Sequence, residues 1–192
     1  MQVVRWLRVY GGDRASVAWR ALGMRGWINM ASGWNDVADL FPGLDAGDLV
    51  DAHNYESPPR CALRRPGEPA RYEALRQTFA LWPLPLTGRA LALGEYGGLG
   101  LPLPGHEWSP ETSWAYGAVS HSAEDLAQRL SALAQRAKAL LCSDLVSALV
   151  YTQWNDVEEE VNGLVSYDRR PKLPSSVLRR FNEQLKEVGL KR

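Results

Sequence analysis

Four short apolar runs are the clearest feature of the hydrophobic pattern along this chain. They cover residues 27–31, 49–52, 89–93 and 145–151, and each is followed by a polar cluster rich in Asn, Asp, Gly or Tyr. Short continuous apolar runs of this kind are typical of parallel strands that are buried on both faces. We therefore expect four parallel strands whose carboxyl ends deliver polar side chains to one site.

Helical periodicity is present in two further segments. Residues 123–142 place leucines at helical spacing behind Ser122, which is suited to the N-cap position. A second helix is expected to begin near Ser175 and to end at Gly189, and a weaker one covers residues 70–81. The order strand, loop, helix, strand predicts an α/β fold with parallel strands and right-handed crossovers.

Residues 97–120 form a long segment rich in Gly, Pro and Trp. The segment is too long for a simple connection, so we interpret it as a functional loop on the face where the strands end. Several of the eight tryptophans lie beside Gly, Pro, Asn or Asp rather than inside periodic apolar runs. Such tryptophans are either stacking platforms for a ligand or half-buried anchors of loops, and the pattern leaves both open.

Composition and charge exclude several classes of partner. Lys plus Arg and Asp plus Glu each number 22, so no basic stripe is available to neutralise a nucleic-acid backbone. No apolar run approaches the length of a membrane span, and Arg5, Arg8 and Asp13 stand where a signal peptide would place its apolar stretch. We expect neither a nucleic-acid nor a membrane partner, and the compartment is unknown, with the cytoplasm as the default.

The two cysteines predict no special chemistry. Cys61 and Cys142 lie far apart, without a CxxC pair or a Cys/His cluster, so neither a zinc site nor a disulfide framework is expected. No other pattern indicates a metal ion or a cofactor, and none is predicted.

From Ile28 onward the chain resembles the catalytic domain of glycoside hydrolase family two, the β-galactosidase and β-glucuronidase group. The resemblance is carried, in the family's order, by INMASGWND (28–36), DAHNY (51–55), LGEYGGLGLPLPGHEW (93–108) and YTQWNDVEEEVNGLVSYDRR (151–170). It implies a partial (β/α)8 TIM barrel over residues 28–192, made of strands five to eight with their helices. Residues 1–27 do not share the resemblance and stay unassigned.

The resemblance assigns the catalytic nucleophile to Glu95, because these retaining enzymes carry a Glu at the end of strand seven. The chemistry agrees, since a retaining glycosidase needs an ionised carboxylate aimed at the anomeric carbon, with an acid about 5 Å away. Glycines beside Glu95 would let a sugar ring approach closely. The alternative is a Glu that caps a helix. Tyr55 resembles the tyrosine that hydrogen-bonds the nucleophile in this group and keeps it ionised.

The remaining candidate residues would contact substrate. Trp154 resembles the aromatic platform on which these enzymes stack a sugar, and its neighbours Gln153, Asn155 and Asp156 either hydrogen-bond sugar hydroxyls or close the rim of the barrel. His53 is either a core histidine with satisfied hydrogen bonds or a substrate contact. The acidic run 158–160 is interpreted as a solvated face or a helix N-terminus that precedes a turn at Asn162. The other candidate pocket residues are Asn29, Trp34, Asn35, His106, Trp108 and Trp114.

The chain departs from the family at the acid/base residue. The family carries that residue as a Glu after Asn at the end of strand four, whereas the only Asn-Glu pair here, Asn182 and Glu183, belongs to the last predicted helix. Our hypothesis is that the reading frame is truncated or frame-shifted. Because four strands cannot close a barrel, we also expect self-association through open sheet edges.

Two functional interpretations follow. The first is a retaining β-glycosidase fragment that acts on carbohydrate through Glu95 and is weak or inactive without its acid. The second is a non-catalytic carbohydrate-binding or pseudogene-derived fragment.

Overall fold

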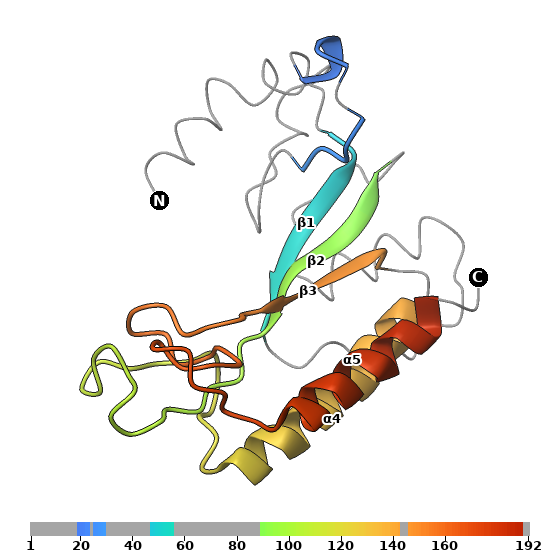
Figure 1. Cartoon of the computed structure of the whole chain (residues 1–192). Helices are drawn as coiled ribbons and strands as arrows, with labels where there is room; N and C mark the ends of the chain where they lie inside the picture. The colour runs from blue at the N-terminus through green and yellow to red at the C-terminus, as the bar shows by residue number, and fades with distance from the viewer. Residues whose placement is uncertain (1–18, 24, 30–46, 56–88, 143–145, 190–192) are drawn as a thin grey trace. The chain divides into compact units, whose positions relative to one another are not determined.

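A computed structural model of the chain contains three strands and two long helices among the residues that it describes (Figure 1). In chain order these elements are β1 (Leu49–Asn54), β2 (Ala90–Gly97), α4 (Ala123–Cys142), β3 (Ala148–Thr152) and α5 (Ser175–Gly189). The structure describes residues 19–23, 25–29, 47–55, 89–142 and 146–189. The chain is therefore an α/β protein, as the alternation of apolar runs and helical segments predicts.

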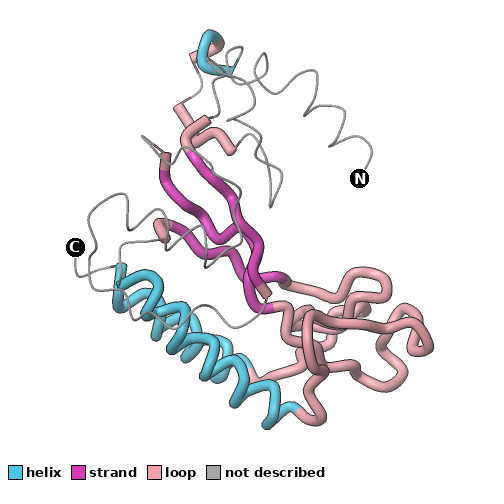
Figure 2. The backbone as a smooth tube through the Cα atoms, turned by 180° about the vertical axis from the view of Figure 1, so that it is seen from behind, coloured by secondary structure: helices cyan, strands magenta, loops and turns pink. Residues whose placement is uncertain are grey.

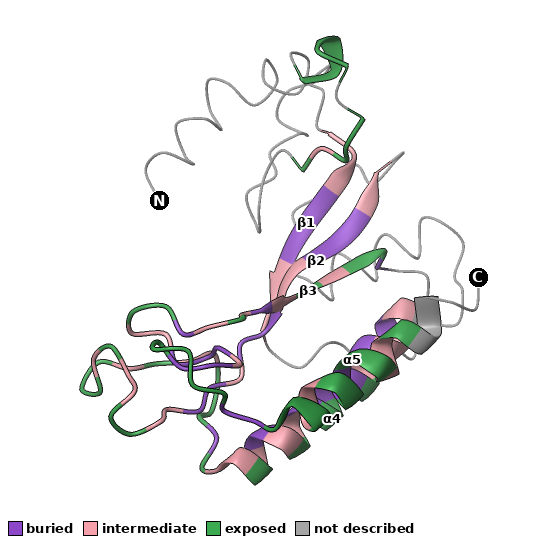
Figure 3. Cartoon of the chain, in the orientation of Figure 1, coloured by how far each residue is buried: buried purple, intermediate pink, exposed green. Residues whose placement is uncertain are grey.

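The three strands form one sheet in the order β1-β2-β3, with β2 in the middle. The strands are parallel, and backbone hydrogen bonds connect Ala90 N to Asp48 O, Ser147 N to Leu91 O and Gly98 N to Thr152 O. The middle of β1 and β2 is buried, as the continuous apolar runs predict (Figure 3). The strand β3 instead alternates between exposed and covered positions.

Two of the strand predictions need correction. Residues 27–29 form no strand but one antiparallel bridge, Asn29 to Gly47, and Trp27 is 81% exposed. The carboxylate of Asp48 accepts the Ile28 amide hydrogen, so the N–H of Ile28 is not available for pairing with a neighbouring strand. The strand predicted at 89–93 continues to Gly97, which places Glu95 inside β2 rather than behind it.

Both long helices lie where the periodicity predicts them. At the start of α4, the Ser122 hydroxyl accepts the Asp125 amide hydrogen and the Asp125 carboxylate accepts that of His121, which satisfies donors at the helix end. The buried face of α4 carries Leu126, Leu130, Leu133 and Leu140. The helix predicted at residues 70–81 lies outside the described part of the chain.

The helices α4 and α5 lie side by side in both views of the backbone (Figures 1 and 2). The side chain of Phe181 is buried on α5, and its ring meets the ring of Tyr151 from β3 edge to face. Within the described residues, neither helix is long and apolar enough to cross a membrane.

The described residues belong to two compact units. The first contains residues 19–53 and 89–94 as far as they are described, together with residues 146–148. The second contains Asn54, Tyr55, the segment from Glu95 through α4, and the segment from Leu149 through α5. Tyr55, Glu95 and Trp154 therefore belong to the same unit, and so do the two long loops that follow β2 and β3.

Candidate functional site

A hydrogen bond joins Tyr55 and Glu95, the two residues for which catalytic roles are predicted. The Tyr55 hydroxyl donates to Oε2 of Glu95, and both side chains are half-buried. Burial, followed by the hydrogen bond to Glu95, raises the pKa of Tyr55 above its ordinary value of 10.0. Tyr55 therefore stays a neutral hydrogen-bond donor throughout the physiological pH range.

A third residue, Tyr116, packs against Tyr55. Its ring lies parallel to the ring of Tyr55, with 3.4 Å between the ring centroids and 2° between the planes. Trp114 meets Tyr116 in an edge-to-face contact at 5.2 Å. The sequence predicts the loop to which both belong, yet it gives no signal that singles out Tyr116, because nothing in a loop shows which rings will meet.

Glycines at the end of β2 allow the aromatic rings to approach the backbone. A Cβ atom on Gly98 would lie 2.5 Å from Cδ2 of Tyr116, and one on Gly97 would lie 2.4 Å from Cε2 of Tyr151. Both glycines also have positive φ angles, of 60° and 95°. Any other residue at these positions would have to move a ring and adopt a conformation that side chains disfavour.

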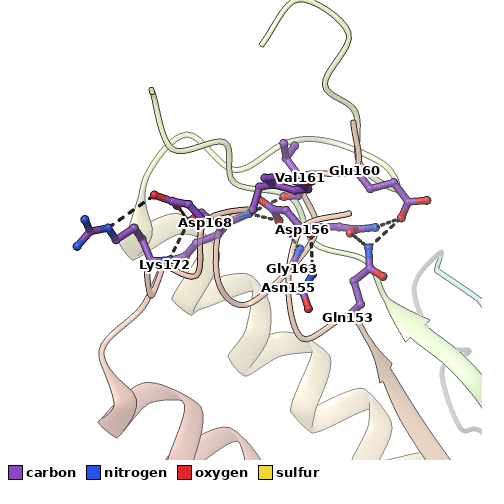
Figure 4. Close-up of polar contacts among 12 residues, drawn as sticks. Gln153, Asn155, Asp156, Glu160, Val161, Gly163, Asp168 and Lys172 are labelled. Carbon is purple, nitrogen blue, oxygen red and sulfur yellow. Dashed lines mark hydrogen bonds and ion pairs between the residues drawn. The ribbon is translucent and has the colours of Figure 1, made fainter. Parts of the chain in front are cut away.

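The loop that follows β3 holds Gln153 in a network of side chains (Figure 4). The Gln153 amide donates to Oε2 of Glu160 at 3.1 Å and to Oδ1 of Asn162 at 2.7 Å, and the Asn162 amide donates to the same Glu160 oxygen. Asn162 is fully buried. The acidic run 158–160 is therefore not a uniform solvated face, because Glu160 turns back toward β3.

Trp154 is 66% exposed, although the backbone around it is well fixed. Its carbonyl accepts the Val165 amide hydrogen at 3.1 Å, and the carbonyl of Gln153 accepts that of Leu164 at the same distance. The neighbouring Asn155 donates its amide to the Asp156 carbonyl at 2.7 Å. The exposed indole is therefore carried by a segment whose backbone is hydrogen-bonded.

Asp156 is buried in the loop that follows β3, and its predicted contact with a sugar stays a prediction. It is 1% exposed, and its Oδ1 accepts hydrogen bonds from the Gly163 amide at 2.8 Å and the Lys172 ammonium at 2.6 Å (Figure 4). Lys172 also donates to the Val161 carbonyl at 2.9 Å. Burial raises the pKa of Asp156 and lowers that of Lys172. The pair connects distant parts of the loop.

Backbone hydrogen bonds join the loop after β3 to the loop after β2. Trp114 N donates to Glu159 O at 2.8 Å, and Trp114 O accepts from Val161 N at 2.9 Å. Val161 O in turn accepts from Leu101 N at 3.0 Å and from the buried ammonium of Lys172. The two loops therefore form one scaffold, and Trp114 and Tyr116 are carried on it.

His106 and Trp108, in the loop that follows β2 (the first loop), contact Asp168 and Tyr167 in the loop that follows β3 (the second loop). Nδ1 of His106 is 2.8 Å from Oδ2 of Asp168, whose Oδ1 accepts a hydrogen bond from the Ser166 hydroxyl at 2.5 Å. The Ser166 and His106 hydrogen bonds lower the pKa of Asp168. Trp108 is 55% exposed and meets the ring of Tyr167 at 4.9 Å. These residues form a partly exposed aromatic and charged surface.

Asn29 and His53 belong to the first unit, where both lie near Asp51. The Asn29 amide donates to Oδ2 of Asp51 at 2.7 Å, and His53 Nε2 is 3.9 Å from Oδ1. The Gly94 amide donates to the same Oδ1 at 3.0 Å, and a Cβ on Gly94 would overlap the carboxylate. The predicted substrate contacts of Asn29 and His53 stay predictions.

Trp34 and Asn35 lie outside the described residues. Within the described part of the chain, no group of three His, Cys, Asp or Glu side chains could hold a metal ion.

The chain was compared with family models, curated proteins and solved structures. No family model matches the chain, and no curated protein matches it. Its structure is similar to that of a β-D-glucuronidase from Dictyoglomus thermophilum, with a TM-score of 0.37 and 15% sequence identity over 75% of this chain. The chain spans only 23% of the length of that enzyme.

Proposed function

We propose that this chain carries the nucleophile side of a retaining β-glycosidase active site, similar to glycoside hydrolase family two. In this proposal β1, β2 and β3 correspond to strands six, seven and eight of a (β/α)8 barrel. The substrate is a β-linked carbohydrate, and Glu95 is the residue that attacks it.

One observation carries the proposal: the Tyr55 hydroxyl donates to the Glu95 carboxylate, across 40 residues of sequence. A carboxylate that accepts a hydrogen bond from a neutral donor is stabilised in its ionised form, which a nucleophile requires. Tyr55 suits this role, because its raised pKa keeps its proton in place. Glu95 lies at the carboxyl end of a parallel strand, where α/β proteins place catalytic side chains.

The reaction has two steps. The Glu95 carboxylate attacks the anomeric carbon, a C–O bond to the enzyme forms, and the C–O bond to the leaving group breaks. Water then attacks the same carbon, the C–O bond to Glu95 breaks, and the proton lost by water passes to the solvent. The product has the original anomeric configuration. The leaving group needs a proton unless it is already a stable anion, and the proposal assigns no residue of this chain to that step.

Trp154 is the proposed stacking surface for the sugar, and its exposed indole supports that assignment. Gln153 and Asn155 are proposed to orient sugar hydroxyls. His106 and Trp108 are proposed to contact a more distant part of the substrate.

Covalent labelling tests the proposal directly. Activated fluoroglycosides with a dinitrophenolate leaving group need no acid, so they can trap a glycosyl-enzyme even where the acid is missing. The full chain would be incubated with β-galactoside, β-glucoside and β-glucuronide versions, and the product would be examined by intact mass and peptide mapping. We expect one label, on Glu95.

Two variants make the result specific. Glu95→Gln should abolish the label, whereas Glu158→Gln, which alters an exposed residue of the acidic run, should leave it unchanged. Labelling of another residue, or no label from any of the three sugars, would contradict the proposal. Sugar binding that persists in Glu95→Gln, in a chain that is never labelled, would instead favour the non-catalytic carbohydrate-binding interpretation.

A further inference from the structure

The stacked pair Tyr55 and Tyr116 needs a physical explanation. Aromatic rings prefer offset or edge-to-face contacts over direct superposition, because superposed faces carry like charge. Here the centroids are 3.4 Å apart and the planes differ by 2°, so the rings superpose almost fully. Because the rings do not prefer this superposed geometry, other contacts around Tyr55 and Tyr116 must hold them in it.

Those contacts come from the loop scaffold and from β2. Gly98 lies under the Tyr116 ring, at a distance that leaves no room for a Cβ. On another side, Trp114 meets Tyr116 edge to face, and the backbone of Trp114 is paired with Glu159 and Val161 on the second loop. The ring of Tyr116 is thus fixed from two sides by elements that do not include Tyr55.

Tyr55, by contrast, is at the end of β1, one residue beyond the strand. Its flat face has Tyr116 against it, and its hydroxyl reaches Glu95. A phenol at a strand end can rotate about two side-chain bonds, and a neighbouring ring that covers one face restricts that rotation. Tyr116 therefore limits where the Tyr55 hydroxyl can lie.

We propose that Tyr116 is a positioning residue that holds the Tyr55 hydroxyl on the Glu95 carboxylate, acting through its flat ring. Its catalytic consequence rests on the proposed function, while the positioning itself does not. A misplacement of about 1 Å at a reacting group can slow a reaction about 100-fold. Loss of the ring should accordingly slow the labelling of Glu95 by about 10-fold to 100-fold.

Three substitutions at position 116 separate the ring from its other properties. Tyr116→Ala removes the ring, and Tyr116→Leu fills part of the same space without a flat face, which keeps the test usable if the alanine variant unfolds. Tyr116→Phe keeps the ring and removes only the hydroxyl, which is hydrogen-bonded to Tyr55. If the ring does the positioning, this variant should retain most of the labelling rate, and a loss as large as in Tyr116→Leu would contradict a role of the ring. Val119→Ala, which removes an exposed side chain from the same loop, is the control and should behave as wild type.

A double-variant cycle shows whether Tyr116 acts through Tyr55. If it does, Tyr55→Phe combined with Tyr116→Leu should label no more slowly than Tyr55→Phe alone, because the hydroxyl to be positioned is already gone. A purely structural role would instead give losses that multiply. Multiplying losses, or full labelling in Tyr116→Leu, would overturn the proposal.

A second measurement needs no glycosidase activity. The seven tyrosines would be labelled with ¹³C at Cζ, and the Tyr55 signal would be assigned by its loss in Tyr55→Phe. We expect this signal to shift in Glu95→Gln and in Tyr116→Leu and to stay in place in Val119→Ala. If Glu95 is never labelled but these shifts occur, the proposed function fails and the positioning stands. An unshifted Tyr55 signal in folded Tyr116→Leu would exclude the positioning whatever the activity.

Discussion

The ammonium group of Lys172 lies 2.6 Å from Oδ1 of Asp156, and the two side chains are 0% and 1% exposed. The two residues are 16 positions apart, one behind β3 and the other ahead of α5. The pair therefore holds together the connection between β3 and α5, which also carries Trp154. Its contribution to the free energy of unfolding can be measured.

Lys172→Met should destabilise the protein by about 3–5 kcal/mol, because it leaves a buried carboxylate without its counter-ion. Urea unfolding followed by far-ultraviolet circular dichroism would give the change. Lys186→Met, at an exposed position of α5, is the matched control and should be nearly neutral. Adding Asp156→Asn to Lys172→Met should recover part of the loss, since the amide oxygen can still accept the Gly163 hydrogen bond without a charge. No recovery would argue against an unpaired charge as the cause.

Gly98→Ala should disturb the Tyr116 ring as well as the backbone. Both Gly98 and Gly117 have positive φ, of 60° and 74°, so alanine at either position should cost about 1 kcal/mol in conformational free energy. A Cβ on Gly98 would meet Tyr116, whereas one on Gly117 has nothing within 4 Å. The difference between the two variants in unfolding free energy therefore isolates the ring contact. Equal losses would mean that Tyr116 moves aside freely.

Trp154→Ala should weaken sugar binding about tenfold, which corresponds to about 1.4 kcal/mol. Isothermal titration calorimetry with methyl β-glycosides would measure the affinity, in the Glu95→Gln background to prevent turnover. Trp27→Ala removes an indole that is even more exposed, at 81%, but belongs to the other unit, and it should leave the affinity unchanged. A similar loss in both variants would indicate nonspecific contacts with tryptophan.

The carboxylate of Asp168 should stabilise the second loop in a pH-dependent way. Hydrogen bonds from Ser166 and His106 lower its folded-state pKa below the ordinary value of 3.8. The stabilisation is therefore fully present above pH 3.8 and is lost as pH falls through the folded-state value. Asp168→Asn should lower the melting temperature at neutral pH, and its difference from wild type should disappear at strongly acidic pH. Glu111→Gln, an exposed change on the first loop, serves as the control. A difference that persists in acid would exclude ionisation as its source.

Much of the secondary structure follows from local sequence. The leucine spacing and Ser122 predict α4, and the continuous apolar runs predict β1, β2 and most of β3, because these signals reside in neighbouring residues. The same reasoning failed for residues 27–29, where the Asp48 carboxylate takes the Ile28 amide hydrogen, and for the end of β2, which continues through Glu95. Both errors come from partners that are distant in the chain.

The candidate site divides in the same way. The sequence by itself determined that Glu95, Tyr55 and Trp154 each belong to a polar cluster that follows an apolar run, and that glycines flank Glu95. Only the tertiary structure decided that Tyr55 donates to Glu95, that Tyr116 covers Tyr55, and that Asp156 is buried against Lys172. Residue type and local spacing are properties of a single segment. Burial and hydrogen-bond partners instead depend on which segments fold against each other. Here the loops after β2 and β3 fold against each other through the backbone hydrogen bonds of Trp114 and Val161.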